Sequence, residues 1–443
     1  MQTILVAGAG KTSVFLIDYL LANSQRMSWK VIVADSNLDA IIDKTNRHPN
    51  SEAVVLDIFD EQRRAELVER ADIVISLLPP ALHILLAEDC LKYKKNLVTS
   101  SYISDEMKAL EPRVKEAGLM FMCEMGLDPG IDHMTANQII HGIQKVAGSI
   151  TSFKSFAGGL VSSESDTNPW HYKFSWNPRN VVLAGSNGGK YLSNGKVVDV
   201  SYAELFAHPK RGAKIDGAGT LVYYPNRDSV AYMDKYDLPD VKTFLRATYR
   251  YSGFMRGWNV LIQLGLTDPN DTVNATTYAE WVRNKNGFDP NKPLIEQVAA
   301  KLDTSVTDTY INMAAWLGIF EDKPIQPAKT NSADILLDVL LNRWAMKPND
   351  KDLVIMRHEV EYLHKNNSKT TLTSTMTVKG DNSKYSAMAK TVGLPMAILA
   401  KLVLSKKIKP PVGVLIPSMP LVYKPVLAEL RDHGIVFKEE IDQ

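Results

Sequence analysis

The first strand-like segment of the chain runs directly into a glycine turn. Ile4–Ala7 is an apolar run, Gly8 and Gly10 follow it, and apolar residues at helical spacing begin at Val14. This order of strand, glycine turn and helix is typical of the first βαβ unit of a dinucleotide-binding domain. Gly8 permits a tight turn, and the missing Cβ at Gly10 lets a pyrophosphate approach the helix N-terminus. The sequence predicts a dinucleotide site at Gly8, Gly10, Lys11, Thr12 and Ser13.

The turn departs from the full dinucleotide fingerprint at the third glycine position, which is Ser13. The tripeptide Gly10-Lys11-Thr12 also resembles the end of a Walker A phosphate-binding loop. That loop requires a glycine five residues before its Gly-Lys pair, where this chain has Leu5. We therefore exclude a P-loop and retain the dinucleotide site.

The second strand-like segment, Lys30–Ala34, ends in Asp35. An acid at this position, about 25 residues after the glycine turn, can accept hydrogen bonds from both ribose hydroxyls of an adenosine. The same carboxylate repels a 2′-phosphate, so Asp35 favours NAD over NADP. A helix N-cap or a solvated turn residue is the structural alternative, and the sequence leaves it open.

The composition is that of an ordinary soluble protein. The chain has 443 residues, of which 23% are charged and 45% hydrophobic, and its formal net charge is +1. This balance gives no indication of a nucleic-acid or anionic-membrane partner, and we expect neither. The apolar stretches are shorter than a bilayer span and a strand begins at the first residues, so we expect no membrane segment and no signal peptide.

Cysteine and histidine usage is typical of a cytoplasmic protein without a structural metal. The two cysteines, Cys90 and Cys123, lie in apolar surroundings without the spacing of a pair. We interpret them as buried thiols rather than as a disulfide. The nine histidines show no metal-ligand spacing, and we expect no metal site.

The first part of the chain alternates strand-like and helical segments, which is the pattern of a doubly wound parallel sheet. A helix is expected over Glu61–Arg70, and the apolar run Asp72–Leu78 is typical of a buried parallel strand. The segments after Leu78 and Val98 would then lie at the carboxyl ends of strands, where such sheets bind ligands.

The pattern changes after Gly130. Residues 149–224 alternate in polarity between turn residues, as in a mixed sheet, and residues 239–346 have helical spacing. Strand patterns return on both sides of Asn366–Ser368, where we expect a hairpin turn. The pattern of residues 386–443 predicts helices, which prolines interrupt.

These patterns predict an α/β protein of two domains. The first is a Rossmann-type domain with a doubly wound parallel sheet over residues 1–128, completed by residues from about 386 to 443. The second is an α+β substrate domain over residues 129–385, with a mixed sheet and a helical insertion from about 239 to 346.

Polar clusters follow the predicted strands of the first domain. Thr99–Tyr102 supplies four hydroxyls that can bind phosphate or carboxylate oxygens, and a helix N-cap is the alternative for each of them. Gly126–His133 lies where the domains join, and its turn presents Asp128 at the ligand edge. Asp132 and His133 more often cap the next helix, and a catalytic role for His133 is the alternative.

Two arginines of the second domain, Arg227 and Arg250, can each bind a carboxylate through a bidentate guanidinium. A lone arginine is more often a surface residue. Spacing by itself does not decide between these two interpretations.

Five segments, in order along the chain, carry a resemblance to a known family: Val98–Ser104, Glu124–His133, Tyr172–Trp176, Tyr224–Ser229 and Thr391–Pro395. Over essentially its whole length the chain resembles saccharopine dehydrogenases of the L-glutamate-forming type, also called saccharopine reductases. The resemblance implies a Rossmann domain completed by C-terminal segments, a mixed-sheet substrate and dimerisation domain with a helical insertion, and a homodimer.

The resemblance also implies site residues. The turn from Gly10 to Ser13 would face the cofactor phosphates, and the nicotinamide side would be lined by Thr99, Ser100, Leu127, Asp128, Pro129 and Ser175. Saccharopine, an amino-acid derivative with three carboxylates, would be bound by Ser101, Tyr102, Arg227, Thr248, Tyr249 and Arg250. The two arginines can neutralise two of its carboxylates, and Asp128 and Tyr102 are the candidates for proton handling.

Two departures from the family bear on function. Fungal biosynthetic members have an arginine at the end of the second strand that suits the 2′-phosphate of NADP, whereas Ala34–Asn37 has none. NAD is therefore favoured, and NADP stays open from the resemblance. A cysteine of the family's Gly-Gly segment is replaced by Ala157, so a mechanism that needs a thiol there is excluded.

The sequence therefore predicts an oxidoreductase of lysine metabolism that interconverts saccharopine with L-glutamate and α-aminoadipate semialdehyde. One alternative is a carboxynorspermidine dehydrogenase-like reductive condensation, which needs fewer carboxylate-binding arginines. The other is a non-catalytic protein that senses dinucleotides; the near-neutral charge and the lack of a recognisable DNA-binding element disfavour it.

Overall fold

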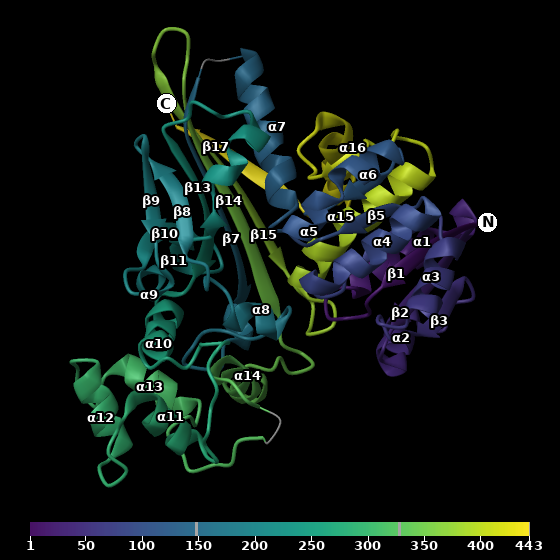
Figure 1. Ribbon diagram of the computed structural model, residues 1–443. Helices are drawn as coiled ribbons and strands as arrows, with labels where there is room; N and C mark the ends of the chain where they lie inside the picture. The colour runs from purple at the N-terminus through teal and green to yellow at the C-terminus, as the bar shows by residue number, and fades with distance from the viewer. Residues whose placement is uncertain (147–148, 327–328, 443) are drawn as a thin grey trace. The chain divides into compact units, whose positions relative to one another are not determined.

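The computed structural model describes residues 1–146, 149–326 and 329–442, and the chain divides into two compact units whose elements are labelled in Figure 1. The first unit consists of Met1–Ile150 and Tyr362–Gln443, and the second of Thr151–Glu361. The sequence predicts divisions near residues 128 and 386. In the structure, the first unit also contains α7 (Ile131–Val146) and β15 (Lys369–Lys379).

The first unit contains a seven-stranded parallel sheet in the order β16-β6-β5-β4-β1-β2-β3. Its strands are β1 (Gln2–Ala7), β2 (Trp29–Asp35), β3 (Ser51–Val55), β4 (Ile73–Ser76), β5 (Asn96–Thr99), β6 (Met120–Met122) and β16 (Gly413–Leu415). Without β16 this is the Rossmann order, which changes direction between β1 and β4. The predicted doubly wound parallel sheet is confirmed, and its switch point lies beside the glycine turn.

Helices connect these strands and cover the sheet. They are α1 (Val14–Met27), α2 (Leu38–Thr45), α3 (Glu61–Arg70), α4 (His83–Tyr93), α5 (Asp105–Ala109), α6 (Glu111–Glu116), α7, α15 (Ala387–Leu404) and α16 (Pro420–Asp432). Helix α3 begins where the sequence predicts, because the Asp60 carboxylate accepts the N–H of Arg63 at 3.0 Å.

A glycine of α15 lets this helix approach α1 closely. A Cβ at Gly393 would lie 3.1 Å from both the Thr12 carbonyl oxygen and the Leu16 nitrogen. In a full fingerprint the third glycine allows close packing at the start of the helix, but here that position is Ser13. The close approach of α15 to the start of α1 depends instead on Gly393. This gives the Thr391–Pro395 motif a packing role beside the glycine turn.

Helix α15 corrects the expectation that no apolar stretch is long enough to cross a membrane. Its 18 residues have a mean hydropathy of 1.6, and 83% of them are buried inside the protein. Burial of this kind is typical of a central core helix.

The sequence predicts a helical C-terminal tail, but in the structure this tail is only partly helical. It contains two helices and two strands, β16 and β17 (Phe437–Asp442). The three residues of β16 are too few to show a periodicity, and they become a strand by pairing in parallel with β6. Strand β17 pairs antiparallel with β15.

The second unit is built on a mixed sheet in which β10, β11, β13, β7 and β14 follow one another. Its strands are β7 (Ile150–Val161), β8 (Gly189–Ser193), β9 (Lys196–Val200), β10 (Lys210–Ile215), β11 (Gly219–Pro225), β12 (Arg227–Asp228), β13 (Thr243–Arg250) and β14 (Asp352–Leu363). Strand β13 runs parallel to β7 and antiparallel to β11. The predicted mixed sheet is confirmed.

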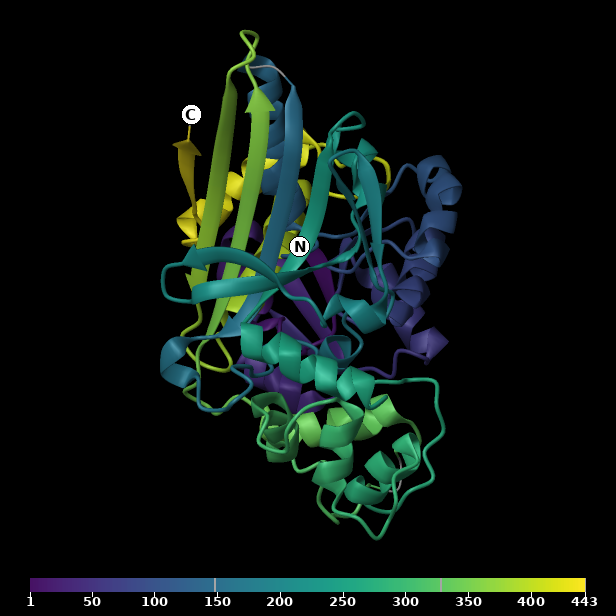
Figure 2. The same cartoon turned by 90° about the vertical axis from the view of Figure 1, so that its left-hand side faces the viewer.

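Helices of the second unit gather at one end of this sheet, shown in green in Figure 2. They are α10 (Ser252–Gln263), α11 (Tyr278–Asn286), α12 (Leu294–Lys301), α13 (Thr309–Trp316) and α14 (Ser332–Arg343), with the short α8 (Pro178–Val182) and α9 (Tyr202–Leu205) before them. The predicted helical start near residue 239 is wrong, because Thr243–Arg250 is the central strand β13. Its β-branched and aromatic residues favour a strand.

Candidate functional site

The glycine turn has the geometry that an anionic ligand needs. Gly8 has a φ of +107°, and a Cβ there would lie 3.0 Å from the backbone carbonyl of Leu77, so only glycine fits. A Cβ at Gly10 would meet nothing within 4 Å. The turn therefore leaves open space at Gly10, where the sequence predicts a phosphate.

The three residues after Gly10 differ in their exposure to solvent. Ser13 is fully buried, and its hydroxyl donates to the Gly10 carbonyl at 2.8 Å. Lys11 is exposed and Thr12 is half-buried. Ser13 thus shapes the turn from inside, whereas Lys11 and Thr12 are accessible to a ligand.

Asp35 lies against the glycine turn. Its Oδ2 accepts the N–H of Ala9 at 2.6 Å, and its Oδ1 accepts the N–H of Asn37 at 3.0 Å. The N-cap of α2 is Asn37, whose side chain accepts the N–H of Ala40. Asp35 is therefore not the helix cap, and its half-buried carboxylate stands beside the predicted phosphate site.

The polar cluster after β5 lies beside the segment that follows β6. The N–H of Met125 donates to the Thr99 carbonyl and that of Glu124 to the Ser101 carbonyl, each at 3.0 Å. A Cβ at Gly126 would lie 2.9 Å from the Cβ of Ser100. The two segments that the sequence singles out are thus brought together by the parallel pairing of β5 with β6.

Tyr102 and Asp128 form a pair at this position. The Tyr102 hydroxyl donates to Oδ1 of Asp128 at 3.0 Å. Both side chains are half-buried, whereas Leu127 and Pro129 on either side of Asp128 are buried. The two residues that were predicted to handle a proton are therefore in direct contact, and the loop presents Asp128 rather than its neighbours.

The loop around Asp128 is closed tightly. The Gly126 N–H donates to the Pro129 carbonyl at 2.9 Å, and the Ile131 N–H donates to the Gly126 carbonyl at 2.9 Å. Gly130 has a φ of +147°, and a Cβ there would lie 2.1 Å from the Gly126 oxygen. The loop can form only with glycine at position 130.

Buried acidic residues and a histidine contact this loop or lie next to it in the chain. The His133 Nε2 lies 2.7 Å from a Glu124 carboxylate oxygen, and Asp132 Oδ1 accepts the Gly130 N–H at 2.6 Å. All three side chains are buried. Asp132 therefore bonds back to the loop, and His133 contacts Glu124, which is not the helix-capping contact that the sequence predicts.

One residue that the sequence analysis missed, His83, connects the strand-end hydroxyls. His83 lies at the start of α4, its Nδ1 is 2.7 Å from the Ser76 hydroxyl, and its Nε2 is 2.7 Å from the Ser101 hydroxyl. The Thr99 hydroxyl lies 3.1 Å from the same Nε2. One sequence feature could have identified His83 as a site residue. It lies in the segment after Leu78, which the sequence places at the ligand edge of the sheet.

Lowering the pH from 7 to 5 is expected to destabilise the protein by about 2 kcal/mol more than it destabilises a His83→Gln variant. Burial lowers the pKa of His83 from 6.5 to about 4. Between these values the unfolded chain binds a proton that the folded protein does not. This contribution to stability is complete above pH 6.5 and is lost as the pH falls toward 4.

Urea denaturation of both proteins at the two pH values measures this difference. All other groups titrate in both proteins and cancel in the comparison. An identical loss of stability in the wild type and in His83→Gln would contradict the prediction.

In the second unit, Arg250 is a buried cation at the end of β13. Its Nη1 donates to the Tyr249 carbonyl at 2.8 Å, and its guanidinium lies 5.5 Å from the ring centroids of Tyr172 and Phe254. Its exposed fraction is 4%, its Nε has no hydrogen-bond partner, and no carboxylate pairs with it among the described residues. A buried charge of this kind calls for an anion.

Three other predicted site residues of this unit, two for the substrate and Ser175 for the nicotinamide side, have different surroundings. Arg227 is exposed with a φ of +53°, and Thr248 is half-buried. Ser175 is buried, and its neighbour Lys173 pairs with Asp350 at 2.7 Å. The Lys173 charge is thus compensated inside the protein, in contrast to that of Arg250.

The position of the Tyr249 side chain gives no support to its predicted contact with the substrate, which stays a prediction. Tyr249 is fully buried in the hydrophobic core, where its ring stacks on Phe156 with centroids 4.9 Å apart. Successive residues of a strand face opposite sides, so Thr248 and Arg250 share the other face of β13. A Cβ at Gly158 would lie 2.9 Å from the Tyr249 Cβ, which explains a glycine there.

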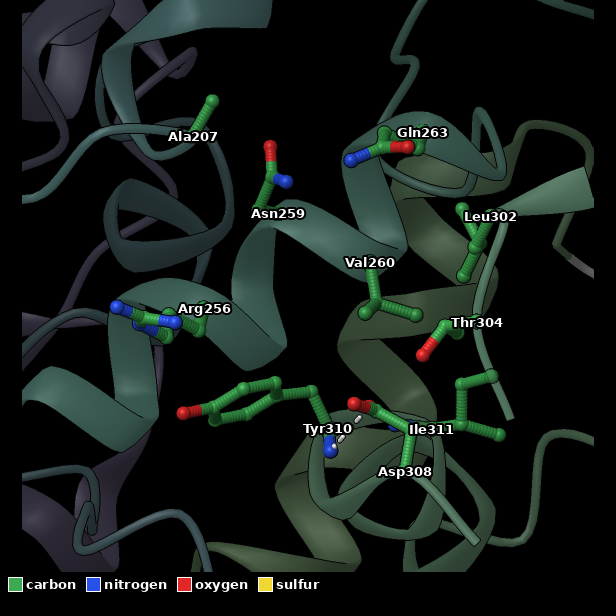
Figure 3. A pocket seen from close by; sticks show the side chains of 10 residues that line it. All are labelled: Ala207, Arg256, Asn259, Val260, Gln263, Leu302, Thr304, Asp308, Tyr310 and Ile311. Carbon is green, nitrogen blue, oxygen red and sulfur yellow. Dashed lines mark hydrogen bonds between the residues drawn. The ribbon is translucent and has the colours of Figure 1, made fainter. Parts of the chain in front are cut away.

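A pocket of about 190 Å³ lies elsewhere in the second unit, among α10, α12 and α13 (Figure 3). The Asp308 carboxylate at this pocket accepts the N–H of Tyr310 at 2.8 Å and caps α13. None of the predicted site residues lines it. The sequence signals therefore point to the strand ends and not to this pocket.

The described residues contain no group of three or more His, Cys, Asp or Glu side chains that could hold a metal ion. Both cysteines are free and buried, which confirms the interpretation of Cys90 and Cys123 as buried thiols.

Two family models match the chain. The saccharopine dehydrogenase NADP binding domain matches residues 4–122, and the saccharopine dehydrogenase C-terminal domain matches residues 126–435. Together they span both units. The first match coincides with the strands and helices that carry the glycine turn and Asp35.

Named relatives agree with these family models. The saccharopine dehydrogenase of Saccharomyces cerevisiae, named as NADP(+)-dependent and L-glutamate-forming, is 35% identical over 99% of this chain and 99% of its own. The mitochondrial α-aminoadipic semialdehyde synthase of Mus musculus is 33% identical over 99% of this chain and 48% of its own length.

A solved structure matches the whole chain. The apo, histidine-tagged saccharopine dehydrogenase (L-Glu forming) from Saccharomyces cerevisiae superposes with a TM-score of 0.87 at 34% identity and covers 100% of both chains. These matches do not favour the carboxynorspermidine or dinucleotide-sensing alternatives. The chain is an NAD(P)-dependent oxidoreductase that belongs to the saccharopine dehydrogenase family.

Proposed function

We propose that the protein interconverts saccharopine with L-glutamate and α-aminoadipate semialdehyde: a hydride passes to a nicotinamide dinucleotide, water adds to the resulting imine, and the carbon–nitrogen bond breaks, or the same steps run in reverse. The observation that carries this proposal is the buried, uncompensated guanidinium of Arg250. Saccharopine has three carboxylates, and a desolvated arginine binds a carboxylate more strongly than an exposed one does. The family membership supports the same substrate.

The dinucleotide, when bound, supplies the hydride acceptor or donor. The side chains and backbone groups of the protein bind and orient the dinucleotide and the substrate. The open turn at Gly10 and the first N–H groups of α1 suit the phosphates, and Asp35 suits a ribose. Arg250, at the end of β13, binds one substrate carboxylate and so restricts the orientation of the bound substrate.

Tyr102 and Asp128 handle the proton of the substrate amine in this proposal. The amine must lose its proton before a hydride can leave the adjacent carbon. The Tyr102 hydroxyl donates to Asp128 Oδ1, which brings a hydroxyl and a carboxylate together as the groups that take up the amine proton. Because Ala157 replaces a family cysteine, no thiol takes part at that position.

The test is turnover of saccharopine by the purified chain with NAD and with NADP. We expect reduced dinucleotide and L-glutamate to form in a one-to-one ratio. A diamine with aspartate semialdehyde serves as the competing substrate pair in the reductive direction. Turnover of that pair alone, or dinucleotide binding without any saccharopine oxidation, would contradict the proposal.

We also propose that this chain prefers NAD to NADP. The matched family domain and the yeast relative are named for NADP, and the proposal rests on Asp35. Its carboxylate lies 2.6 Å from the Ala9 nitrogen, and the residues from Ala34 to Asn37 include no arginine. A negative charge beside the ribose repels a 2′-phosphate.

The kcat/KM with NAD is expected to exceed that with NADP at least about tenfold. Asp35→Ala is expected to lower kcat/KM with NAD about tenfold or more and to raise the NADP/NAD ratio. The control is Asp39→Ala, which removes an exposed acid from the first turn of α2 and should leave the ratio unchanged. An NADP preference in the wild type would contradict the role of Asp35.

Finally, we propose a cytoplasmic homodimer. Two buried free thiols suit a reducing compartment, and exposed apolar side chains near the C-terminus, Val436 and Ile441, suit contact with a second copy. Light scattering should give twice the 49.3 kDa chain mass. A mass equal to one chain at micromolar concentration would contradict the dimer.

A further inference from the structure

We propose that His83 is a positioning residue that orients the Ser101 hydroxyl to donate a hydrogen bond to a carboxylate of the substrate. This inference rests on the proposed function. It concerns a residue that the reaction described above does not use. The geometry behind it is a chain of three contacts, Ser76 Oγ to His83 Nδ1, His83 Nε2 to Ser101 Oγ, and Thr99 Oγ1 to the same Nε2.

The network is built by the fold. Ser76 and Thr99 are paired residues at the carboxyl ends of the neighbouring parallel strands β4 and β5, and His83 begins the helix after β4. Ser76, His83 and Thr99 are buried, whereas Ser101 is half-buried. Ser101 is therefore the group through which the network can reach a ligand at the sheet's ligand edge.

The protonation state of the imidazole determines what Ser101 can offer. Burial lowers the pKa of His83 to about 4, so the ring is neutral near pH 7 and has one N–H donor and one acceptor nitrogen. Two tautomers then give opposite directions to the hydrogen bonds.

In one tautomer, Nδ1 accepts from Ser76, Nε2–H donates to Ser101, and the Ser101 proton is left for a ligand. In the other, Nε2 accepts from Ser101, which then presents only lone pairs outward. A carboxylate needs a donor, so binding of the substrate favours the first tautomer. Ser76, on the far side of the ring, can satisfy either tautomer, because its hydroxyl donates to Nδ1 in the first and accepts from Nδ1–H in the second.

A pair of variants of similar size tests the role. His83→Leu removes both ring nitrogens, and His83→Gln keeps an N–H donor that can reach Ser101. We expect His83→Leu to raise the KM for saccharopine about tenfold or more, with the Kd for the dinucleotide changed less than about threefold. His83→Gln should restore most of the KM. Ser76→Ala, which removes the hydroxyl that lies 2.7 Å from Nδ1, should have an intermediate effect.

The contrary results are equally clear. A folded His83→Leu protein with the wild-type KM would overturn the proposal. An equal loss in His83→Leu and His83→Gln, with an equal loss of dinucleotide affinity, would show that the ring only supports the fold and would also overturn it.

A measurement without turnover separates this inference from the proposed function. Nitrogen NMR of histidine-labelled protein, with His83→Gln used to assign the signal, reports which ring nitrogen is protonated when L-glutamate is added. We expect protonation at Nε2, and protonation at Nδ1 would overturn the role of His83. Failure of the wild type to oxidise saccharopine would overturn the proposed function and leave this result standing.

Discussion

Replacing Arg250 with methionine is expected to remove nearly all activity while making the folded protein more stable. The kcat/KM for saccharopine should fall about 10²-fold to 10³-fold, because a desolvated charge-assisted hydrogen bond to the substrate contributes about 3–4 kcal/mol. Without substrate, the buried guanidinium has one hydrogen bond to a carbonyl and no carboxylate among the described residues. An apolar side chain of similar length should therefore raise the free energy of unfolding by about 1 kcal/mol.

Arg343 provides a matched control. It also donates to a carbonyl, that of Leu317, and its guanidinium also lies near an aromatic ring, 5.3 Å from the centroid of Trp316. Arg343 is exposed, however, so Arg343→Met should change neither kcat/KM nor stability by much. Urea denaturation and initial rates measure both effects. Full activity in Arg250→Met, or a large loss of its stability, would show that Arg250 is a structural residue.

Gly130→Ala is expected to destabilise the protein by about 4 kcal/mol or more and to abolish turnover. A Cβ at this position would lie 2.1 Å from the Gly126 oxygen and 2.3 Å from the Gly126 nitrogen. These are backbone atoms whose hydrogen bonds to Pro129 and Ile131 close the loop, so they cannot move without opening it. Strain of this kind combined with lost hydrogen bonds is among the most destabilising effects of a single substitution.

Gly10→Ala is the contrasting substitution. A Cβ there meets nothing within 4 Å, so stability should change by less than about 0.5 kcal/mol. Dinucleotide affinity should nevertheless fall about tenfold or more, because the new methyl group occupies the space that the phosphates need. Thermal unfolding and dinucleotide titration measure the two effects. Equal stability of Gly130→Ala and Gly10→Ala would contradict the description of the loop.

The sequence predicts the first unit well because its signals are local. A parallel sheet that is covered on both faces has strands that read as continuous apolar runs, and its turns need glycine at particular places such as Gly8. Asp35 and the Thr99–Tyr102 cluster could be found in the same way, since each directly follows such a strand. The strand–helix order thus determines which side chains reach the ligand edge.

The errors arise where neighbours in space decide the outcome. Thr243–Arg250 is a strand because it pairs with β7 and β11, and Gly413–Leu415 is a strand because it pairs with β6. The helical spacing of the neighbouring residues hides both strands in the sequence. The sequence groups Tyr249 with Arg250, whereas the alternation of strand β13 places their side chains on opposite faces. The sequence does not identify His83, because its partners come from two other segments, Ser76 at the end of β4 and the Thr99–Tyr102 cluster after β5.

The sequence by itself determined the dinucleotide-binding turn, the acid at the end of the second strand and the family, since each depends on residue types at fixed spacing along the chain. Only the tertiary structure decided what the distant residues do. Arg250 is one arginine among many in the sequence, and its importance comes from burial without a compensating carboxylate. His83 acquires its role because parallel pairing of β4 with β5 brings Ser76, Thr99 and Ser101 around one desolvated ring.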